Sequence, residues 1–236
     1  MKILIPMAGE GSRFKKDGYT FPKPLIDVNG KPMIQTVVEN LDFDAEYIFL
    51  VRQEHIDKYE IESLLNVVTN DRATVIPVDG LTEGAACTAL LAEAHIDTDD
   101  ELLIANSDQY VEFSGKNFNT FRRLTAVDAM VFTFNAVHPK WSFVKVNSRG
   151  VATEVAEKHP ISNIATCGIY YYRHGSDFVR YARQMIEKDI RVNGEFYICP
   201  VYNELIADGK MLVPFYVHEM NGLGTPEDLK KYLNGK

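Results

Sequence analysis

Short apolar runs alternate with amphipathic segments through the first half of the chain. Runs rich in Ile, Leu and Val, bounded by polar or turn residues, lie at 2–6, 46–51, 73–78, 101–106 and 128–134. Between them, apolar residues recur with helical spacing at 32–41, 59–68 and 84–95. Strands that alternate with helices are typical of a parallel sheet covered on both faces. The pattern therefore predicts an α/β fold.

The pattern changes after residue 140. Antiparallel strands are predicted at 142–146, 151–158 and 165–173, helices at 176–189 and 196–209, a strand at 211–220 and a last helix at 225–233. The last helix has its own start signal, with Thr225 as N-cap, Pro226 at the first helical position and Asp228 three residues after the cap. No repeat or flexible linker interrupts the chain, so we expect a single domain over residues 1–236.

Composition narrows the class of protein. With 236 residues and 46% hydrophobic residues the chain can form a packed core, and its net charge of −8 excludes the overall basic field of nucleic-acid binders. No run is long enough for a membrane span or a signal peptide, so we expect neither a membrane partner nor export. Cys87, Cys167 and Cys199 are far apart and lack metal-ligand spacing, which favours a reduced, cytoplasmic protein.

A glycine pair follows the first predicted strand, in the stretch from Met7 to Phe14. The dinucleotide fingerprint requires a third glycine where Phe14 stands, and the spacing of a mononucleotide P-loop also fails. Gly9 and Gly11 allow backbone amides to face an anion, and Arg13 can bind two phosphate oxygens. The alternative is that the two glycines form only a tight turn.

Lys23 lies between Pro22 and Pro24, so its backbone is stiff and its ammonium is directed to one place. An extended loop without chemistry is the alternative. A lysine held in this way, shortly after the glycine pair and Arg13, favours a phosphate site built locally in an acidic protein.

Together, the glycine loop and the Pro-Lys-Pro-Leu segment resemble the motifs of the sugar-1-phosphate nucleotidyltransferase family. Four further stretches resemble small capsule- or surface-polysaccharide-type members: 82–92, 106–109, 193–205 and 222–229. The resemblance implies a three-layer α/β/α, Rossmann-like fold of GT-A type with a mainly parallel mixed sheet. It also implies a nucleotide-binding half, 1–136, and an acceptor-binding half, 137–236, which share one sheet.

The activity implied by the resemblance is Mg²⁺-dependent transfer from a nucleoside triphosphate to a sugar 1-phosphate or similar phosphate monoester. Its products are an NDP-sugar and pyrophosphate. The implied catalytic residues are Arg13, Lys23 and Asp108. The implied nucleotide-binding residues are Met7, Ala8, Gly9, Glu10, Gly11, Ser12, Arg13, Gly84 and Ala85. The small residues near Gly84 could equally serve close helix packing.

Asp108 follows the predicted strand 101–106, at the end where open α/β sheets hold ligands, and the family uses an acid there to bind Mg²⁺. Family members commonly have a second aspartate before Gly-Thr, but here Gly222 takes its place before Gly224 and Thr225. The expected second ligand is therefore Asn221, whose amide oxygen suits Mg²⁺. An extra water on the metal, an oxygen from Glu219, or a turn-capping role for Asn221 are the alternatives.

For the acceptor side, the resemblance implies Lys158, Gly168 and Glu195, and Trp141 is expected to form a wall of the pocket. Lys158 would meet the acceptor phosphate, although His159 interrupts the family's Glu-Lys-Pro motif. Each of these residues also has a purely structural interpretation.

Three other functions compete with this interpretation. One is a cytidylyltransferase that uses a non-sugar phosphate such as phosphocholine, which the aromatic residues 170–172 and Trp141 would suit. Another is a GT-A-type glycosyltransferase, although such enzymes usually hold their metal with Asp-x-Asp. The third is a regulatory subunit that binds nucleotide without catalysis. Base, acceptor and homo-oligomeric state are left open by the sequence.

Overall fold

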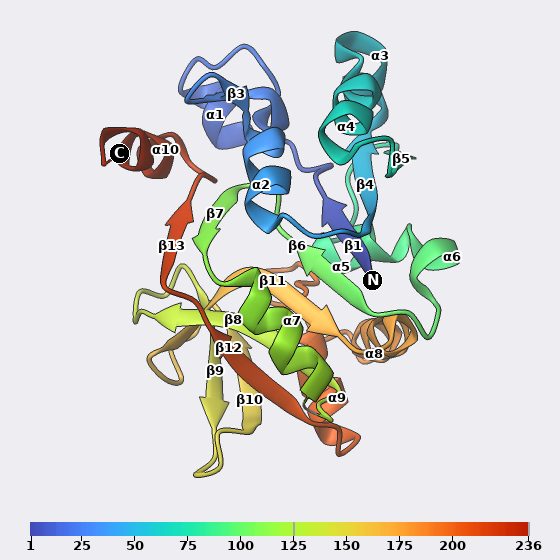
Figure 1. Ribbon diagram of the computed structural model, residues 1–236, viewed down its shortest axis with the longest axis vertical. Helices are drawn as coiled ribbons and strands as arrows, with labels where there is room; N and C mark the ends of the chain where they lie inside the picture. The colour runs from blue at the N-terminus through green and yellow to red at the C-terminus, as the bar shows by residue number, and fades with distance from the viewer. Residues whose placement is uncertain (125, 236) are drawn as a thin grey trace.

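The computed structural model describes residues 1–124 and 126–235. Within them, nine strands form one mixed sheet (Figure 1). Its parallel centre has the order β6, β1, β4, β5, with bounds Leu102–Ala105, Lys2–Pro6, Glu46–Arg52 and Ala73–Val78. The parallel strands predicted from the first half of the sequence are therefore confirmed.

The strand β11 (Ile164–Tyr172) joins this centre to the strands of the second half. Its last residues pair antiparallel with β6, while its first residues lie beside β9. The remaining strands are β8 (Ala129–Asn135), β9 (Ser142–Val146), β10 (Ala152–Glu157) and β12 (Leu212–Tyr216). Because β8 and β11 pair antiparallel, the sheet is mixed, as expected.

Alternate residues of the central strands enter two separate cores, which shows that both faces of the sheet are covered. Leu4 and Ile48 pack on one side with α5, α8 and α9, whereas Ile3 and Phe49 pack on the other with α2, α4 and α7. The helices of the two layers are α2 (Met33–Leu41), α3 (Gln53–Tyr59), α4 (Ile61–Thr69), α5 (Ala85–Leu90), α6 (Glu93–Ile96), α7 (Gly115–Leu124), α8 (Gly175–Glu187) and α9 (Val201–Ala207).

A third, smaller core connects the two ends of the chain. Phe14 of α1 (Ser12–Lys16) packs with Leu223 and with Leu229 of α10 (Pro226–Asn234). Nearby are the short elements η1 (Lys23–Leu25), β2 (Asp27–Val28) and β3 (Lys31–Pro32), and the pair β7 (Gln109–Glu112) and β13 (Glu219–Gly222). The C-terminal helix therefore lies beside the glycine loop, as Figure 1 shows.

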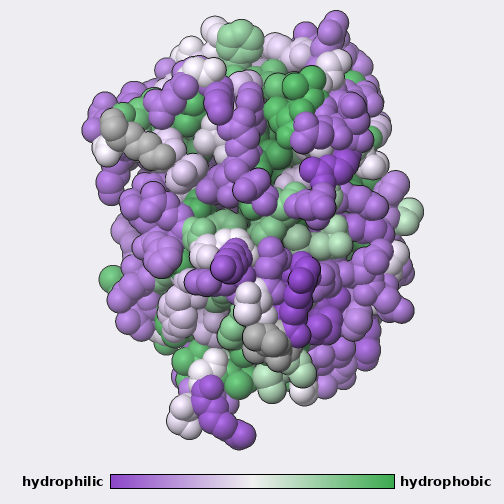
Figure 2. All heavy atoms as spheres, viewed as in Figure 1, coloured by the Kyte–Doolittle hydropathy of each residue, from purple (hydrophilic) through white to green (hydrophobic). Residues whose placement is uncertain are grey.

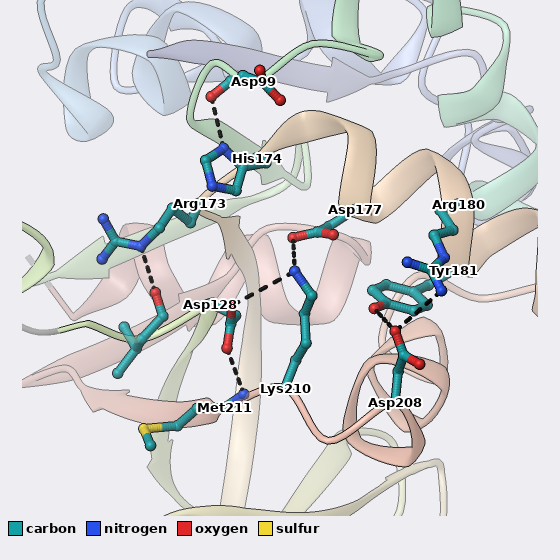
Figure 3. A network of polar contacts seen from close by, with 11 residues as sticks. Asp99, Asp128, Arg173, His174, Asp177, Arg180, Tyr181, Asp208, Lys210 and Met211 are labelled. Atoms are coloured by element: carbon teal, nitrogen blue, oxygen red, sulfur yellow. Dashed lines mark hydrogen bonds and ion pairs between the residues drawn. The ribbon is translucent and has the colours of Figure 1, made fainter.

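A polar network fastens α8 to the sheet (Figure 3). Lys210 Nζ lies 3.0 Å from Asp177 Oδ2 of α8 and 3.6 Å from Asp128 Oδ1. Tyr181 donates to Asp208 Oδ2 at 2.7 Å. These contacts hold the helix layer in place next to β8 and β12.

Two predicted elements differ in the structure. The helix expected at 196–209 begins only at Val201, because residue 196 instead exchanges backbone hydrogen bonds with the segment 83–86. The strand expected at 211–220 divides into β12 and β13, because the chain leaves β8 after Val217 and pairs with β7. In both cases a long-range backbone contact overrides the local pattern.

Hydrophilic side chains cover most of the face seen in Figure 2. No helix in the described part of the chain has the length and apolar character to cross a membrane.

Candidate functional site

The glycine loop leaves β1 at its carboxyl end and turns into α1. Gly11 is the N-cap of α1 in the left-handed conformation, with φ 62°, and its carbonyl accepts from the Phe14 amide at 3.0 Å. A Cβ on Gly11 would lie 3.1 Å from Cβ of Lys23. The glycine therefore allows the loop to approach the Pro-Lys-Pro segment closely.

The side chain of Lys23 donates from Nζ to Asp108 Oδ2, at the carboxyl end of β6. The two side chains are 22% and 25% exposed, so water screens this pair only in part. The contact brings together two residues 85 positions apart in the sequence, both of which were predicted to be catalytic.

The C-terminal segment closes over Asp108. The backbone carbonyl of Asp108 accepts a hydrogen bond from the Leu223 amide at 2.8 Å. A Cβ on Gly224 would lie 2.4 Å from Asp108 Oδ2. Only glycine at 224 leaves the carboxylate free to face the space in front of β6.

These groups surround a cavity of about 500 Å³. Of the predicted site residues, it is lined by Met7, Gly9, Gly11, Arg13, Lys23, Ala85, Asp108, Trp141, Lys158 and Gly168. The tertiary structure thus brings residues of both predicted halves to one space.

A second cavity of about 390 Å³ shares Pro6, Gly9 and Ala85 with the first. Its lining includes the predicted residues Ala8, Glu10 and Gly84. Glu195 also lies here, on the side of the glycine loop and Gly84, although it was predicted on the acceptor side.

Gly84 allows two segments to touch. With φ 137° it has a conformation that other residues rarely adopt, and a Cβ would lie 2.4 Å from the Phe196 carbonyl oxygen. The Phe196 amide donates to Glu83 at 2.9 Å, and the Ala86 amide donates to Phe196 at 3.0 Å. A segment of the second half therefore completes the second cavity.

Lys158, which was predicted to meet the acceptor phosphate, lines the first cavity. It has a left-handed backbone, with φ 55°, and its amide donates to the Trp141 carbonyl at 3.0 Å. Its Nζ donates to the Tyr197 hydroxyl and lies 4.3 Å from the centre of that ring. The unusual backbone at 158 precedes the inserted His159, and the lysine still faces the cavity.

Glu157, the neighbour of Lys158, is a partly buried acid that lines the same cavity. Burial raises the pKa of its carboxyl, although Ser142 donates a hydrogen bond to it and Lys158 is near. The Glu157 carboxyl therefore holds its proton more tightly than an exposed carboxyl does.

The local packing requires a glycine at position 168. Its φ is 75°, and a Cβ would lie 2.3 Å from Asn106 Nδ2 and 2.5 Å from Gln109 Oε1. Its carbonyl accepts from the amide of Asn106 and from Gln109 Nε2. It therefore allows the ends of β6 and β11 to pack.

In the described structure, Ser12 and Asn221 line neither cavity. Met220 and Gly222 of β13 do face the first cavity, so alternation directs the side chain of Asn221, between them, to the opposite face. This orientation does not bring Asn221 to Asp108, and its role as a metal ligand stays a prediction.

Other residues of the cavity had no role in the sequence analysis, above all Lys140, Tyr197 and Asp228. Asp228 was noted only as part of a helix start signal, which the structure confirms, since its amide donates to Thr225 Oγ1 at 3.1 Å. Within the described residues, no three carboxylate, imidazole or thiol side chains gather as a metal site built by protein alone would require. A metal ion here would complete its coordination shell with waters or with oxygens of a bound substrate.

Comparison with known proteins agrees with this geometry. A family model described as "Nucleotidyl transferase" matches residues 2–232. The bifunctional protein GlmU of Methanocaldococcus jannaschii is 27% identical over 242 residues, covering 100% of this chain and 55% of that protein. The UTP–glucose-1-phosphate uridylyltransferase AglF of Haloferax volcanii is 24% identical, covering 97% and 93%.

Among solved structures, the nucleoside-diphosphate-sugar pyrophosphorylase from Vibrio cholerae RC9 has a TM-score of 0.83 at 24% identity, over 98% of this chain and 99% of that one. This likeness confirms the fold. The chain spans about half the length of the two archaeal GlmU proteins that it matches.

Proposed function

The chain belongs to the nucleotidyl transferase family, and we propose that it transfers a nucleotidyl group from a nucleoside triphosphate to a sugar 1-phosphate. The observation that carries the proposal is the Lys23–Asp108 pair, which lines one cavity together with the glycine loop and Lys158. Similarity to the UTP–glucose-1-phosphate uridylyltransferase AglF and to the Vibrio nucleoside-diphosphate-sugar pyrophosphorylase supports a nucleotide-sugar product.

The chemistry requires alignment and charge neutralisation more than a general base. An acceptor phosphate is already an anion near neutral pH, so its oxygen attacks the α-phosphorus directly. A new bond forms between this oxygen and the α-phosphorus, the bond from the α-phosphorus to the bridging oxygen breaks, and pyrophosphate leaves with the electron pair. The product is an NDP-sugar.

Three cations of the cavity, Arg13, Lys23 and Lys158, have distinct tasks in this reaction. Arg13 and the amides of the glycine loop hold the triphosphate tail, and Lys158 holds the acceptor phosphate. Lys23, between them, stabilises the charge that develops around the α-phosphorus. The nucleobase lies in the second cavity, against the backbone of Gly84.

The donor set fits the Mg²⁺ ion that the family implies. Asp108 provides a hard carboxylate oxygen at the carboxyl end of β6, and the absence of a side chain at Gly224 keeps it accessible. When bound, Mg²⁺ would neutralise phosphate charge during the transfer.

A cationic acceptor such as phosphocholine is a second candidate, because aromatic rings in the cavity already hold ammonium groups. Lys140 Nζ lies 4.6 Å from the ring of Trp141, and Lys158 Nζ lies 4.3 Å from that of Tyr197. Either candidate is compatible with synthesis of a surface polysaccharide. The three free cysteines suit the reducing cytoplasm.

Pyrophosphate release from a panel of nucleoside triphosphates and acceptors tests the proposal. We expect release that depends on Mg²⁺ and on a sugar 1-phosphate. Release only with phosphocholine or another non-sugar phosphate would favour the second candidate. Transfer from a finished nucleotide-sugar, or no release with any pair, would contradict both.

A further inference from the structure

Asp228 lies in the first turn of α10 and lines the same cavity as Asp108. Its carboxylate lies beside Gly222, since a Cβ on that glycine would be 3.6 Å from Asp228 Cγ and Oδ2. A Cβ on Gly224, two residues further along the chain, would lie 2.4 Å from Asp108 Oδ2. The carboxylates of Asp228 and Asp108 therefore both lie next to the segment 222–224 and line one cavity.

Both carboxylates are paired with lysines that also line the cavity. Lys23 pairs with Asp108, and Lys140 Nζ lies 3.0 Å from Asp228 Oδ1. These lysines come from different segments, since Lys23 is the first residue of η1 and Lys140 precedes β9. In the absence of substrate, each carboxylate thus has a cation that a divalent metal ion would have to displace.

The third acid of the cavity, Glu157, is a poorer candidate for metal binding. It is partly buried, its Oε2 accepts a hydrogen bond from Ser142, and it is the neighbour of Lys158, the residue proposed to hold the acceptor phosphate. Asp108 and Asp228 remain as the accessible carboxylates, with side chains 25% and 27% exposed.

We propose that Asp228 is the second carboxylate that binds the divalent cation. In the metal-free protein, the ammonium group of Lys140 occupies the position beside Asp228 that the cation would take. The inference rests on the proposed function, since Mg²⁺ is usually bound by one or two carboxylates together with substrate phosphates. Metal binding displaces Lys23 and Lys140 from the two carboxylates, and both ammonium groups become available to phosphate oxygens in the same cavity.

The structure offers variants that separate metal binding from helix capping. Thr225 donates to Asp228 Oδ2 at 2.9 Å and accepts from the Asp228 amide. Asp228→Asn keeps a side-chain oxygen that can accept from the Thr225 hydroxyl, and it keeps the backbone amide that donates to Thr225. It removes only the negative charge. Glu227→Gln is the matched control, because it removes one charge from the same helix turn at a residue that does not line this cavity in the described structure.

The experiment measures Mn²⁺ binding to the nucleotide-free full chain by the electron paramagnetic resonance signal of free Mn²⁺. We expect Asp228→Asn to weaken binding by about tenfold or more, the lower end of what loss of a supporting residue costs a metal site. We expect Glu227→Gln to leave binding unchanged. Lys140→Met should tighten binding, because it removes the competing cation and does not alter the helix cap.

Unchanged Mn²⁺ binding by Asp228→Asn would overturn the inference, as would equal weakening by Glu227→Gln or weaker binding by Lys140→Met. Melting curves accompany each variant, and if Asp228→Asn unfolds, Lys140→Met alone decides. Binding of Mn²⁺ needs neither nucleotide nor acceptor. Pyrophosphate release with unaltered Mn²⁺ binding in Asp228→Asn would therefore remove this inference and leave the proposed function intact.

Discussion

The carbonyl oxygen of Phe196 lies 2.4 Å from the place that a Cβ atom on Gly84 would occupy. This close approach connects the loop after β5 with the segment before α9, and it forms one side of the second cavity. Two halves of the chain therefore meet at a position where no side chain fits.

Replacement of Gly84 by alanine should be costly for stability. The φ of 137° is strained for alanine, and the added methyl would collide with backbone atoms that cannot rotate away. We expect the free energy of unfolding to fall by about 3 kcal/mol or more, measured by urea denaturation.

Gly209→Ala is the control for Gly84→Ala. Gly209 also has a positive φ, 79°, but a Cβ there would meet nothing within 4 Å. Gly209→Ala should lower the free energy of unfolding by only about 1 kcal/mol, from backbone strain alone. Equal losses in the two variants would show that the contact with Phe196 adds nothing.

Asp108→Asn should lower the rate of pyrophosphate release by a factor of about 100 or more, because it removes the charge expected to bind Mg²⁺. The melting temperature should change little, since the pair with Lys23 is partly exposed. Asp99→Asn, before the opposite end of β6, should retain the wild-type rate. A near-normal rate for Asp108→Asn at saturating Mg²⁺ would contradict the metal role.

Lys158→Met should raise KM for the acceptor and leave KM for the nucleoside triphosphate unchanged. Loss of a charged hydrogen bond to the acceptor phosphate costs about 1.5 to 3 kcal/mol, so KM for the acceptor should rise about 10- to 100-fold. KM for the triphosphate should stay the same. Lys145→Met, on the exposed side of β9, is the control, and a rise confined to the triphosphate KM would reassign Lys158.

The stability difference between wild type and Glu157→Gln should depend on pH. Burial raises the pKa of Glu157 in the folded protein, so the fold binds this proton more tightly than the unfolded chain does. The contribution of Glu157 is therefore fully present below its ordinary pKa of about 4.3 and is lost as pH rises through the raised value.

Melting temperatures of both proteins from pH 4 to pH 8 test this sign. Relative to wild type, Glu157→Gln should become more stable as pH increases. A difference that is constant with pH, or that changes in the opposite direction, would show that the carboxyl is not destabilised by burial.

Local features of this protein could be predicted from its sequence because they depend on neighbouring residues. Period-2 and helical spacing identified the central strands and most helices, and Thr225 marked the start of α10. The order of Gly11, Arg13 and Lys23 after the first strand was enough to indicate a phosphate site. The end of the predicted strand at 101–106 also indicated the position of Asp108, at the edge of the sheet that the carboxyl ends of the parallel strands share.

The tertiary structure decided which distant residues complete the cavities. The helical pattern at 196–209 gave no sign that Phe196 would instead bond to the loop at Gly84, because that contact spans more than a hundred positions. Alternation along β13 turned Asn221 away from Asp108, and the register of β13 depends on its pairing with β7. Asp228 came to lie beside Gly222 because α10 packs against the glycine loop through Phe14 and Leu229. Side-chain periodicity specifies local structure, whereas such placements depend on the packing energy of segments far apart in the chain.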